Sequence, residues 1–166
     1  MEIPITTLVD LFLTTKRTEG RSPRTIGWYR EKLSPVARFL NPEGEATLAD
    51  FTLANIRAFV ADLQGREERF ADHPGRPTEP GGLSAHTIQG YVRAVKAFSA
   101  WLDEEEFTAG SRLAKLKRPK VGEPVIEVLN EGEIAALIGA INPDTFLGGR
   151  LYAILLLLLD TGIRAT

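Results

Sequence analysis

The 166-residue sequence contains no cysteine and only two histidines. The lack of cysteine excludes disulfide bonds, thiolate metal sites and cysteine nucleophiles, and it fits a reducing compartment. His73 and His86 do not form a metal-ligand cluster, so no metal or other cofactor is expected. The longest apolar run, residues 151 to 159, is much shorter than the roughly 20 residues that a membrane-spanning helix needs. With no secretion leader at its start, the chain is expected to be a cytoplasmic globular protein without a membrane partner.

The sequence also lacks a net basic charge, because 20 lysines and arginines are set against 22 aspartates and glutamates. The charges are, however, segregated along the chain. Residues 16 to 38 contain seven basic and two acidic side chains, and residues 112 to 120 contain five basic and no acidic ones, whereas residues 43 to 79 contain eight acids and four arginines. Because local patches set the field that a phosphate backbone meets, the two basic segments are candidates for contact with nucleic acid.

Apolar residues at helical spacing predict four helices in the first 110 residues. The expected helices run from Thr6 or Thr7 to about Lys16, from Pro23 to about Leu40, from Thr52 to Leu63, and from Ser84 to about Glu105. The residues expected on their buried faces are Leu8, Leu11, Phe12, Ile26, Tyr29, Leu33, Val36, Leu40, Leu53, Ile56, Phe59, Val60, Leu63, Ile88, Tyr91, Val95, Phe98 and Leu102.

Several residues mark the expected helix boundaries. Gly20 should close the first helix, and Ser22 should cap the second with Pro23 at its first position. Pro35 should bend or interrupt the second helix, because proline lacks the amide hydrogen and crowds the preceding turn. Ser84 should cap the fourth helix in the same way as Ser22 caps the second.

Less regular segments separate these helices from the end of the chain. Residues 64 to 82 contain glycine, proline and charge without periodicity, which predicts an exposed insertion. Residues 107 to 122 form a basic linker, and residues 124 to 129 alternate weakly like a short strand. Two further helices are expected over residues 131 to 141 and 145 to 159.

The start of the first of these two helices is predicted in detail. Asn130 should cap it, and Glu133 stands at the capping-box position.

An internal repeat links the second and fourth helices. The pattern Ser22-x-x-Thr25-Ile26-x-x-Tyr29 recurs 62 positions later as Ser84-x-x-Thr87-Ile88-x-x-Tyr91, and Phe39-Leu40 recurs as Trp101-Leu102. Chance is one explanation of this repeat, because a capping residue followed by apolar residues at helical spacing occurs in many unrelated helices.

The repeated motif resembles the helices of the SAM-like core-binding domain of tyrosine recombinases, the phage-integrase family. Two later segments resemble that family in the same order: Leu116-Lys117-Arg118-Pro119-Lys120 is similar to its basic interdomain linker, and Val128-Leu129-Asn130-Glu131-Gly132-Glu133-Ile134 is similar to the start of its catalytic domain. Residues 161 to 164, Thr-Gly-Ile-Arg, closely resemble the family's Thr-Gly-Leu-Arg box.

The resemblance implies an all-α fold: a four-helix SAM-like core-binding domain over residues 1 to 110, a linker over 111 to 124, and a two-helix fragment of the catalytic domain over 125 to 166. It implies DNA binding in site-specific recombination or integration. In the family the box arginine is the first catalytic one, which implies that role for Arg164, because a guanidinium can hold two oxygens of the scissile phosphate.

The family's later catalytic residues lie downstream of this box, and the sequence stops at Thr166. Its three tyrosines, Tyr29, Tyr91 and Tyr152, all precede Arg164, so none is assigned as the nucleophile. The chain as given is therefore expected to bind double-stranded DNA without cutting it, and not to be an enzyme. The residues expected to contact DNA, on the second and fourth helices and the linker, are Arg21, Arg24, Lys32, His86, Gln89, Arg93, Lys96, Lys115, Lys117, Arg118 and Lys120.

Two other classes of function are weighed against this interpretation, and one further expectation concerns residues 151 to 159. Asp160-Thr161-Gly162 matches the catalytic triplet of aspartic proteases, although that class needs a β-rich fold around the triplet. The chain could instead be a catalytically dead regulator, or a helical protein-interaction module, derived from a recombinase. Finally, residues 151 to 159 are apolar on all sides, which predicts self-association through this segment.

Overall fold

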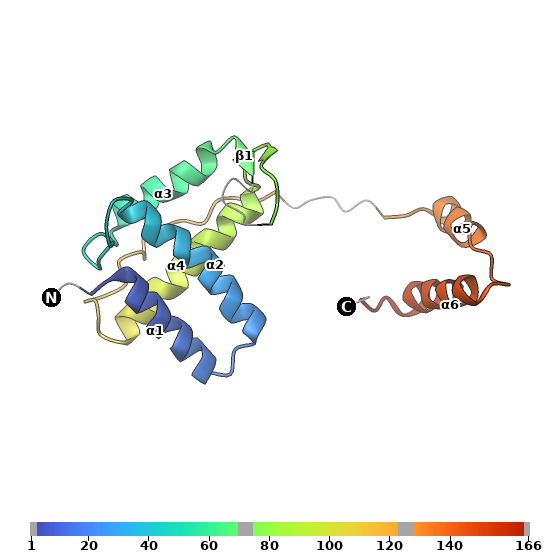
Figure 1. The fold of residues 1–166 in the computed structure, drawn as a ribbon, viewed down its shortest axis with the longest axis horizontal. Coiled ribbons are helices and arrows are strands. Elements are labelled where there is room, and N and C mark those ends of the chain that lie inside the picture. Colours follow the sequence, from blue (N-terminus) through green and yellow to red (C-terminus); the bar gives the residue numbers. More distant parts are fainter. Residues whose placement is uncertain (1–2, 70–74, 123–127, 165–166) are drawn as a thin grey trace. The chain divides into compact units, whose positions relative to one another are not determined.

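The computed structural model describes residues 3–69, 75–122 and 128–164, and the chain divides into two compact units, Met1–Gly122 and Glu123–Thr166. Apart from one pair of two-residue strands, the regular structure of the described residues is helical, which confirms the expected all-α fold (Figure 1). The first unit contains α1 (Ile5–Thr18), α2 (Pro23–Leu40), α3 (Leu53–Gly65), β1 (Glu68–Arg69), β2 (Glu79–Pro80) and α4 (Ala85–Glu104); the second contains α5 (Glu131–Gly139) and α6 (Phe146–Thr161).

Hydroxyl caps begin three of the helices in the first unit. The Ser22 hydroxyl accepts a hydrogen bond from the Thr25 amide at the start of α2, and the Ser84 hydroxyl accepts one from the Thr87 amide at the start of α4, both at 3.2 Å. Thr52 caps α3 in the same manner. Each cap satisfies an amide that the first helical turn leaves without a partner. The predicted caps at Ser22 and Ser84 are confirmed.

The first helix begins differently from the prediction. Pro4 occupies the cap position of α1, without a side-chain cap, so the expected caps at Thr6 or Thr7 are wrong. The Ile5 amide instead donates a hydrogen bond of 2.8 Å to the Ala46 carbonyl, and Pro4 forms an isolated bridge with Thr47. A backbone contact with a distant loop therefore replaces the local cap.

One predicted buried position on α1 and the predicted interruption of α2 also need correction. Leu11 was expected on the buried face of α1, but it is 46% exposed. It lies about 100° around the helix from the buried Phe12, and the stripe formed by Ile5, Leu8 and Phe12 faces the core without it. Pro35 does not interrupt α2, which continues to Leu40. The Ser34 hydroxyl donates a hydrogen bond to the Arg30 carbonyl within this part of the helix.

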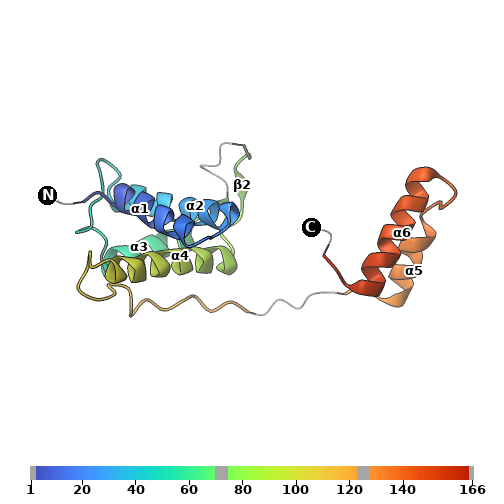
Figure 2. The same ribbon diagram turned by 90° about the horizontal axis from the view of Figure 1, so that it is seen from below.

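The core of the first unit is built around α4, which packs against α1, α2 and α3. In Figure 2, α1 and α2 form one layer and α3 and α4 form the other. Aromatic rings join the layers: Phe12 makes edge contacts with Tyr29, Phe98 and Trp101, and Phe51 contacts Phe98. Because such rings bury large apolar areas, this cluster holds α1, α2 and α4 together, and Phe51 adds the loop before α3.

The segment that follows α4 belongs to the same core. Leu113 and Leu116 are 1% and 6% exposed, although the sequence placed both in the linker. The Arg112 guanidinium donates a hydrogen bond of 2.7 Å to the Leu48 carbonyl and so ties the segment to the loop before α3. Residues 111 to 116 are thus packed onto the helices.

Apart from the half-buried Arg66, the predicted insertion over residues 64 to 82 is exposed in its described part after α3. Glu68 pairs with Pro80 and Arg69 with Glu79 in the antiparallel strands β1 and β2, whose residues are all exposed. The first two residues of the predicted insertion, up to Gly65, belong to α3.

In the second unit, α5 begins with the predicted capping box. The Glu133 amide donates to the Asn130 side chain, and the Asn130 amide donates to the Glu133 carboxylate. The strand expected at 124 to 129 lies largely outside the described residues, and Val128 and Leu129 are not in a strand. No residue of α5 or α6 is buried.

Candidate nucleic-acid interface

The N-terminal halves of α2 and α4 lie beside each other at Gly90 of α4. A side chain added at Gly90 would meet the Trp28 ring at 3.8 Å and the Lys32 side chain at 3.9 Å. Gly90 occupies the position in the internal repeat that corresponds to Trp28 on α2. A methyl group at position 90 would therefore make ordinary van der Waals contacts with Trp28 and Lys32, which places these two residues beside α4.

Most of the residues that the sequence assigned to DNA contact are exposed on the first unit. Lys32, Gln89 and Lys96 are the half-buried exceptions. The exposed members of the set are Arg21, Arg24, His86, Arg93, Lys115, Lys117, Arg118 and Lys120.

Part of this set surrounds a cavity of about 330 Å³. Three of its lining residues are basic and two are aromatic, and none is acidic: Trp28, Tyr29, Arg93, Lys96, Ala97 and Arg118. The cavity therefore lies between α2, α4 and the segment after α4, all within the first unit. Its volume is near the lower end of the range for small-ligand sites, about 300 to 1,000 Å³.

The cations around this cavity are held by neutral groups. The Arg93 guanidinium carbon lies 5.6 Å from the centre of the Trp28 ring, within the range of a cation–π contact. The Lys96 Nζ donates a hydrogen bond of 2.9 Å to the Leu116 carbonyl. In the described ranges, Arg93, Lys96 and Arg118 form no salt bridge with a carboxylate. Their positive charge thus remains available to an anion.

Two other members of the predicted set have structural contacts. The Lys32 Nζ lies 4.6 Å from the centre of the Tyr91 ring and 2.7 Å from a carboxylate oxygen of Glu31, and its side chain is only 12% exposed. The Gln89 side-chain amide donates a hydrogen bond of 3.4 Å to the Pro119 carbonyl. Lys96 and Gln89 together hold the segment from Leu116 to Pro119 beside α4.

Trp28 is the residue of this surface that the sequence interpretation missed. Its ring is only partly buried and makes an edge contact with Tyr29 at 5.0 Å between centres. The sequence feature that could have identified Trp28 is its place in the repeat. The corresponding residue on α4 is a glycine, and basic residues occur on either side in both helices.

A larger cavity of about 750 Å³ lies elsewhere in the first unit, between α1, α2 and the loop at residues 41 to 46. Its lining includes Arg30 and Arg38 but also Asp10 and Glu45. Arg30 forms a salt bridge of 3.8 Å with Asp10. Because charges of both signs line it, this cavity suits a polyanion less well than the smaller one.

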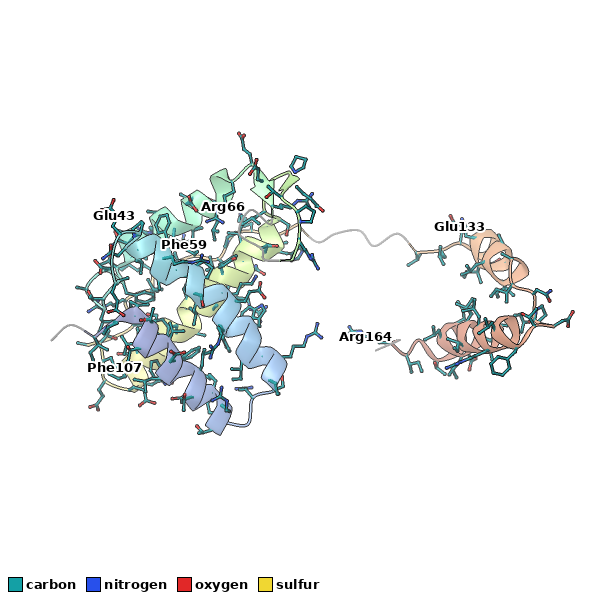
Figure 3. All side chains as sticks on the ribbon, viewed as in Figure 1. Glu43, Phe59, Arg66, Phe107, Glu133 and Arg164 are labelled. Atoms are coloured by element: carbon teal, nitrogen blue, oxygen red, sulfur yellow. The ribbon has the colours of Figure 1, made fainter. Side chains whose placement is uncertain are left out.

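The Thr-Gly-Ile-Arg box forms the turn that ends α6. Gly162 adopts a left-handed conformation, with φ of 62°, and its amide donates to the Leu158 carbonyl. The Thr161 hydroxyl donates a hydrogen bond of 2.6 Å to the Leu157 carbonyl. Arg164 follows this turn and is exposed (Figure 3). Glycine suits this position because a left-handed φ strains other residues.

Comparison with known proteins relates the chain to the tyrosine recombinases over its whole length. It is 28% identical over 166 residues to the tyrosine recombinase XerC of Oceanobacillus iheyensis, covering 100% of this chain and 48% of that protein. It is 26% identical over 160 residues to XerC of Bacillus pumilus and 28% identical over 160 residues to XerD of Neisseria meningitidis serogroup B, in each case covering 96% of this chain and 48% of the relative. The chain thus spans about half the length of these relatives.

Other comparisons gave no match. No protein-family model matches the chain, and no solved structure matches it significantly. Within the described residues, no helix is long and apolar enough to cross a membrane. The same residues contain no group of three or more histidine, aspartate or glutamate side chains arranged to hold a metal ion.

Proposed function

We propose that this chain binds duplex DNA during site-specific recombination and that its first unit provides the binding surface. The observation that carries the proposal is the cavity beside Trp28, where Arg93, Lys96 and Arg118 meet without an acidic lining residue. Phosphate contacts dominate the affinity of proteins for DNA, and they need cations that are not already paired.

Further basic residues on the same elements are proposed to extend this surface. Arg21 and Arg24 lie at the start of α2, and Lys117 and Lys120 lie in the segment after α4; all four are exposed. Among the residues that the structure describes, none of these four has a carboxylate partner closer than the 3.8 Å contact between Arg21 and Glu19. A weak, exposed ion pair of this kind contributes little and yields readily to a phosphate. The names of the relatives support recombination as the process in which the surface acts.

The test is the binding of a labelled duplex to the full 166-residue chain, measured by fluorescence anisotropy across a salt series. Binding that weakens steeply as salt rises is expected, because phosphate contacts release condensed counterions. Absence of binding at low salt, or affinity that does not change with salt, would favour a helical protein-interaction module instead.

For Arg164, we propose contact with the scissile phosphate in the assembled recombinase. Its position directly after the turn at Gly162 supports this role, because the left-handed glycine ends α6 and leaves the guanidinium exposed beyond it. A guanidinium presents two parallel N–H donors to a phosphate.

None of the three tyrosines is proposed as a nucleophile. The Tyr29 ring makes edge contacts with Phe12 and Trp28, and Tyr91 lies between Phe59 and Lys32. Tyr152 lies on α6, and all three precede Arg164. The 166-residue chain is therefore expected to form no covalent adduct with a nicked suicide DNA substrate. A DNA-linked protein band that survives denaturing electrophoresis would contradict this.

A further inference from the structure

We propose that the cavity beside Trp28 is a subsite for one sugar–phosphate unit of a DNA strand, and that Arg93, Lys96 and Arg118 bind the same phosphate there. This inference rests on the proposed function and assigns one site within the DNA-binding surface. The ligand is a phosphodiester: the phosphate lies among the three cations, and the deoxyribose lies against the rings of Trp28 and Tyr29.

The size and lining of the cavity support a unit of this kind. A volume of about 330 Å³ exceeds what a phosphate group alone requires and leaves space for the attached sugar. The wall is divided between cationic and aromatic side chains, which match the charged and the less polar parts of the same unit. A guanidinium offers two donors in a fixed fork, so Arg93 and Arg118 can each hold two phosphate oxygens.

Two of the cations are positioned before any ligand arrives. The Trp28 ring holds the Arg93 guanidinium, and the Leu116 carbonyl holds the Lys96 ammonium. Neither contact neutralises the charge, whereas a salt bridge would. Trp28 therefore positions Arg93 in addition to its own contact with the sugar, and fixing a long side chain in advance lowers the entropy lost on binding.

The third cation comes from a segment whose place depends on α4. Arg118 lies between Leu116 and Pro119, whose carbonyls accept hydrogen bonds from Lys96 and Gln89. The subsite is complete only while this segment stays beside the helix. A phosphate that contacts Arg118 and α4 together thus joins them, so DNA binding at this site should strengthen the docking of the segment.

The test compares two triple variants of the full chain by anisotropy with a duplex across a salt series. The first carries Arg93→Gln, Lys96→Gln and Arg118→Gln, which remove the three charges and keep a polar side chain at each position. The matched control removes three exposed cations outside the cavity and outside both basic segments: Arg57→Gln, Arg69→Gln and Arg150→Gln. The slope of log K against log salt concentration reports the number of phosphates neutralised, at about 0.9 per phosphate on duplex DNA.

If the three cations share one phosphate, the cavity variant loses about 0.9 from the slope and the control loses none. A loss near 2.7 would mean three separate phosphates and would overturn the shared subsite. An unchanged slope in the cavity variant would also overturn it. Both results require that the unmodified chain binds DNA with a salt-dependent affinity. If the proposed function is wrong, the unmodified chain itself will show no such binding, and this outcome is distinct from a failure of the subsite.

The role of Trp28 has its own readout. The Trp28→Leu change should weaken DNA binding several-fold without altering the salt slope, and Trp28→Phe should restore part of the loss because it keeps a ring under Arg93. In NMR spectra of the full chain, DNA should shift the indole resonance of Trp28 and leave that of the buried Trp101 in place. A static Trp28 resonance during DNA binding, or equal affinities for the two variants, would contradict the assignment.

Discussion

The Lys96 Nζ donates a hydrogen bond of 2.9 Å to the carbonyl oxygen of Leu116, 20 residues further along the chain. This contact connects the middle of α4 with the segment that follows it. The Leu116 side chain is itself buried, so both the backbone and the side chain of this residue are engaged. Residues 111 to 116 therefore complete the first unit, and they position the basic residues that come next.

Truncating the Leu113 side chain should show how much this segment contributes to the free energy of unfolding. Leu113 is 1% exposed, and Leu113→Ala should lower the free energy of unfolding by about 2 to 5 kcal/mol, because the change leaves a cavity in a packed core. Urea denaturation of the full chain, followed by circular dichroism, measures this change. The control is Lys115→Ala at an exposed neighbouring position, expected to change stability by less than about 0.5 kcal/mol. If the two variants were equally stable, the segment would contribute nothing to the core and would act only as a linker.

The two serine caps should contribute about equally. Ser22→Ala and Ser84→Ala each remove an acceptor for one amide, so each should lower the free energy of unfolding by about 1 kcal/mol. Thermal or urea denaturation checks this expectation. Ser34→Ala, in the interior of α2, serves as the control and should be neutral or slightly stabilising, because alanine has the higher helix propensity. A loss at Ser34 as large as at the caps would show that the caps have no special role.

The helix boundaries that sequence could predict are those set by local chemistry. Ser22, Ser84 and Asn130 act through residues three positions away, and the capping box at Glu133 needs only its own helix. The start of α1 could not be predicted, because it depends on the contact between Ile5 and Ala46. Such a contact forms only after the chain has folded.

The candidate site was predictable as a set of residues and not as an arrangement. The repeat and the basic segments identified Arg93, Lys96 and Arg118 as separate cations. That they surround one cavity follows from the packing of the segment after α4, which no periodicity in the sequence indicates. Trp28 was placed neither on the buried face of its helix nor among the DNA contacts, because its position beside Arg93 depends on how α2 packs against α4.

The second unit should associate with another copy of itself. Leu151, Ile154, Leu156, Leu157 and Leu159 of α6 are each between 42% and 52% exposed. Burying a few hundred Å² of apolar surface is favourable by several kcal/mol, at about 25 cal/mol per Å². A two-helix unit has too little core to cover these residues itself.

Light scattering tests this expectation. The full chain should be larger than a monomer, and a version that ends at Gly122 should be monomeric and folded. A second version of the full chain, with Leu151→Gln and Leu157→Gln, should also become monomeric. Clean monomers of the unmodified chain would show that α6 is not a self-association surface.

The central claim is that the first unit by itself carries the DNA-binding surface. The most direct test is to measure the salt dependence of duplex binding for a polypeptide of residues 1 to 122 and for the full chain. The account predicts that log K falls linearly with log salt concentration for both, with the same slope. The reason is that the proposed phosphate contacts lie before Gly122, apart from that of Arg164, which is proposed only for the assembled recombinase. Absence of binding by residues 1 to 122, or a slope near zero, would contradict it.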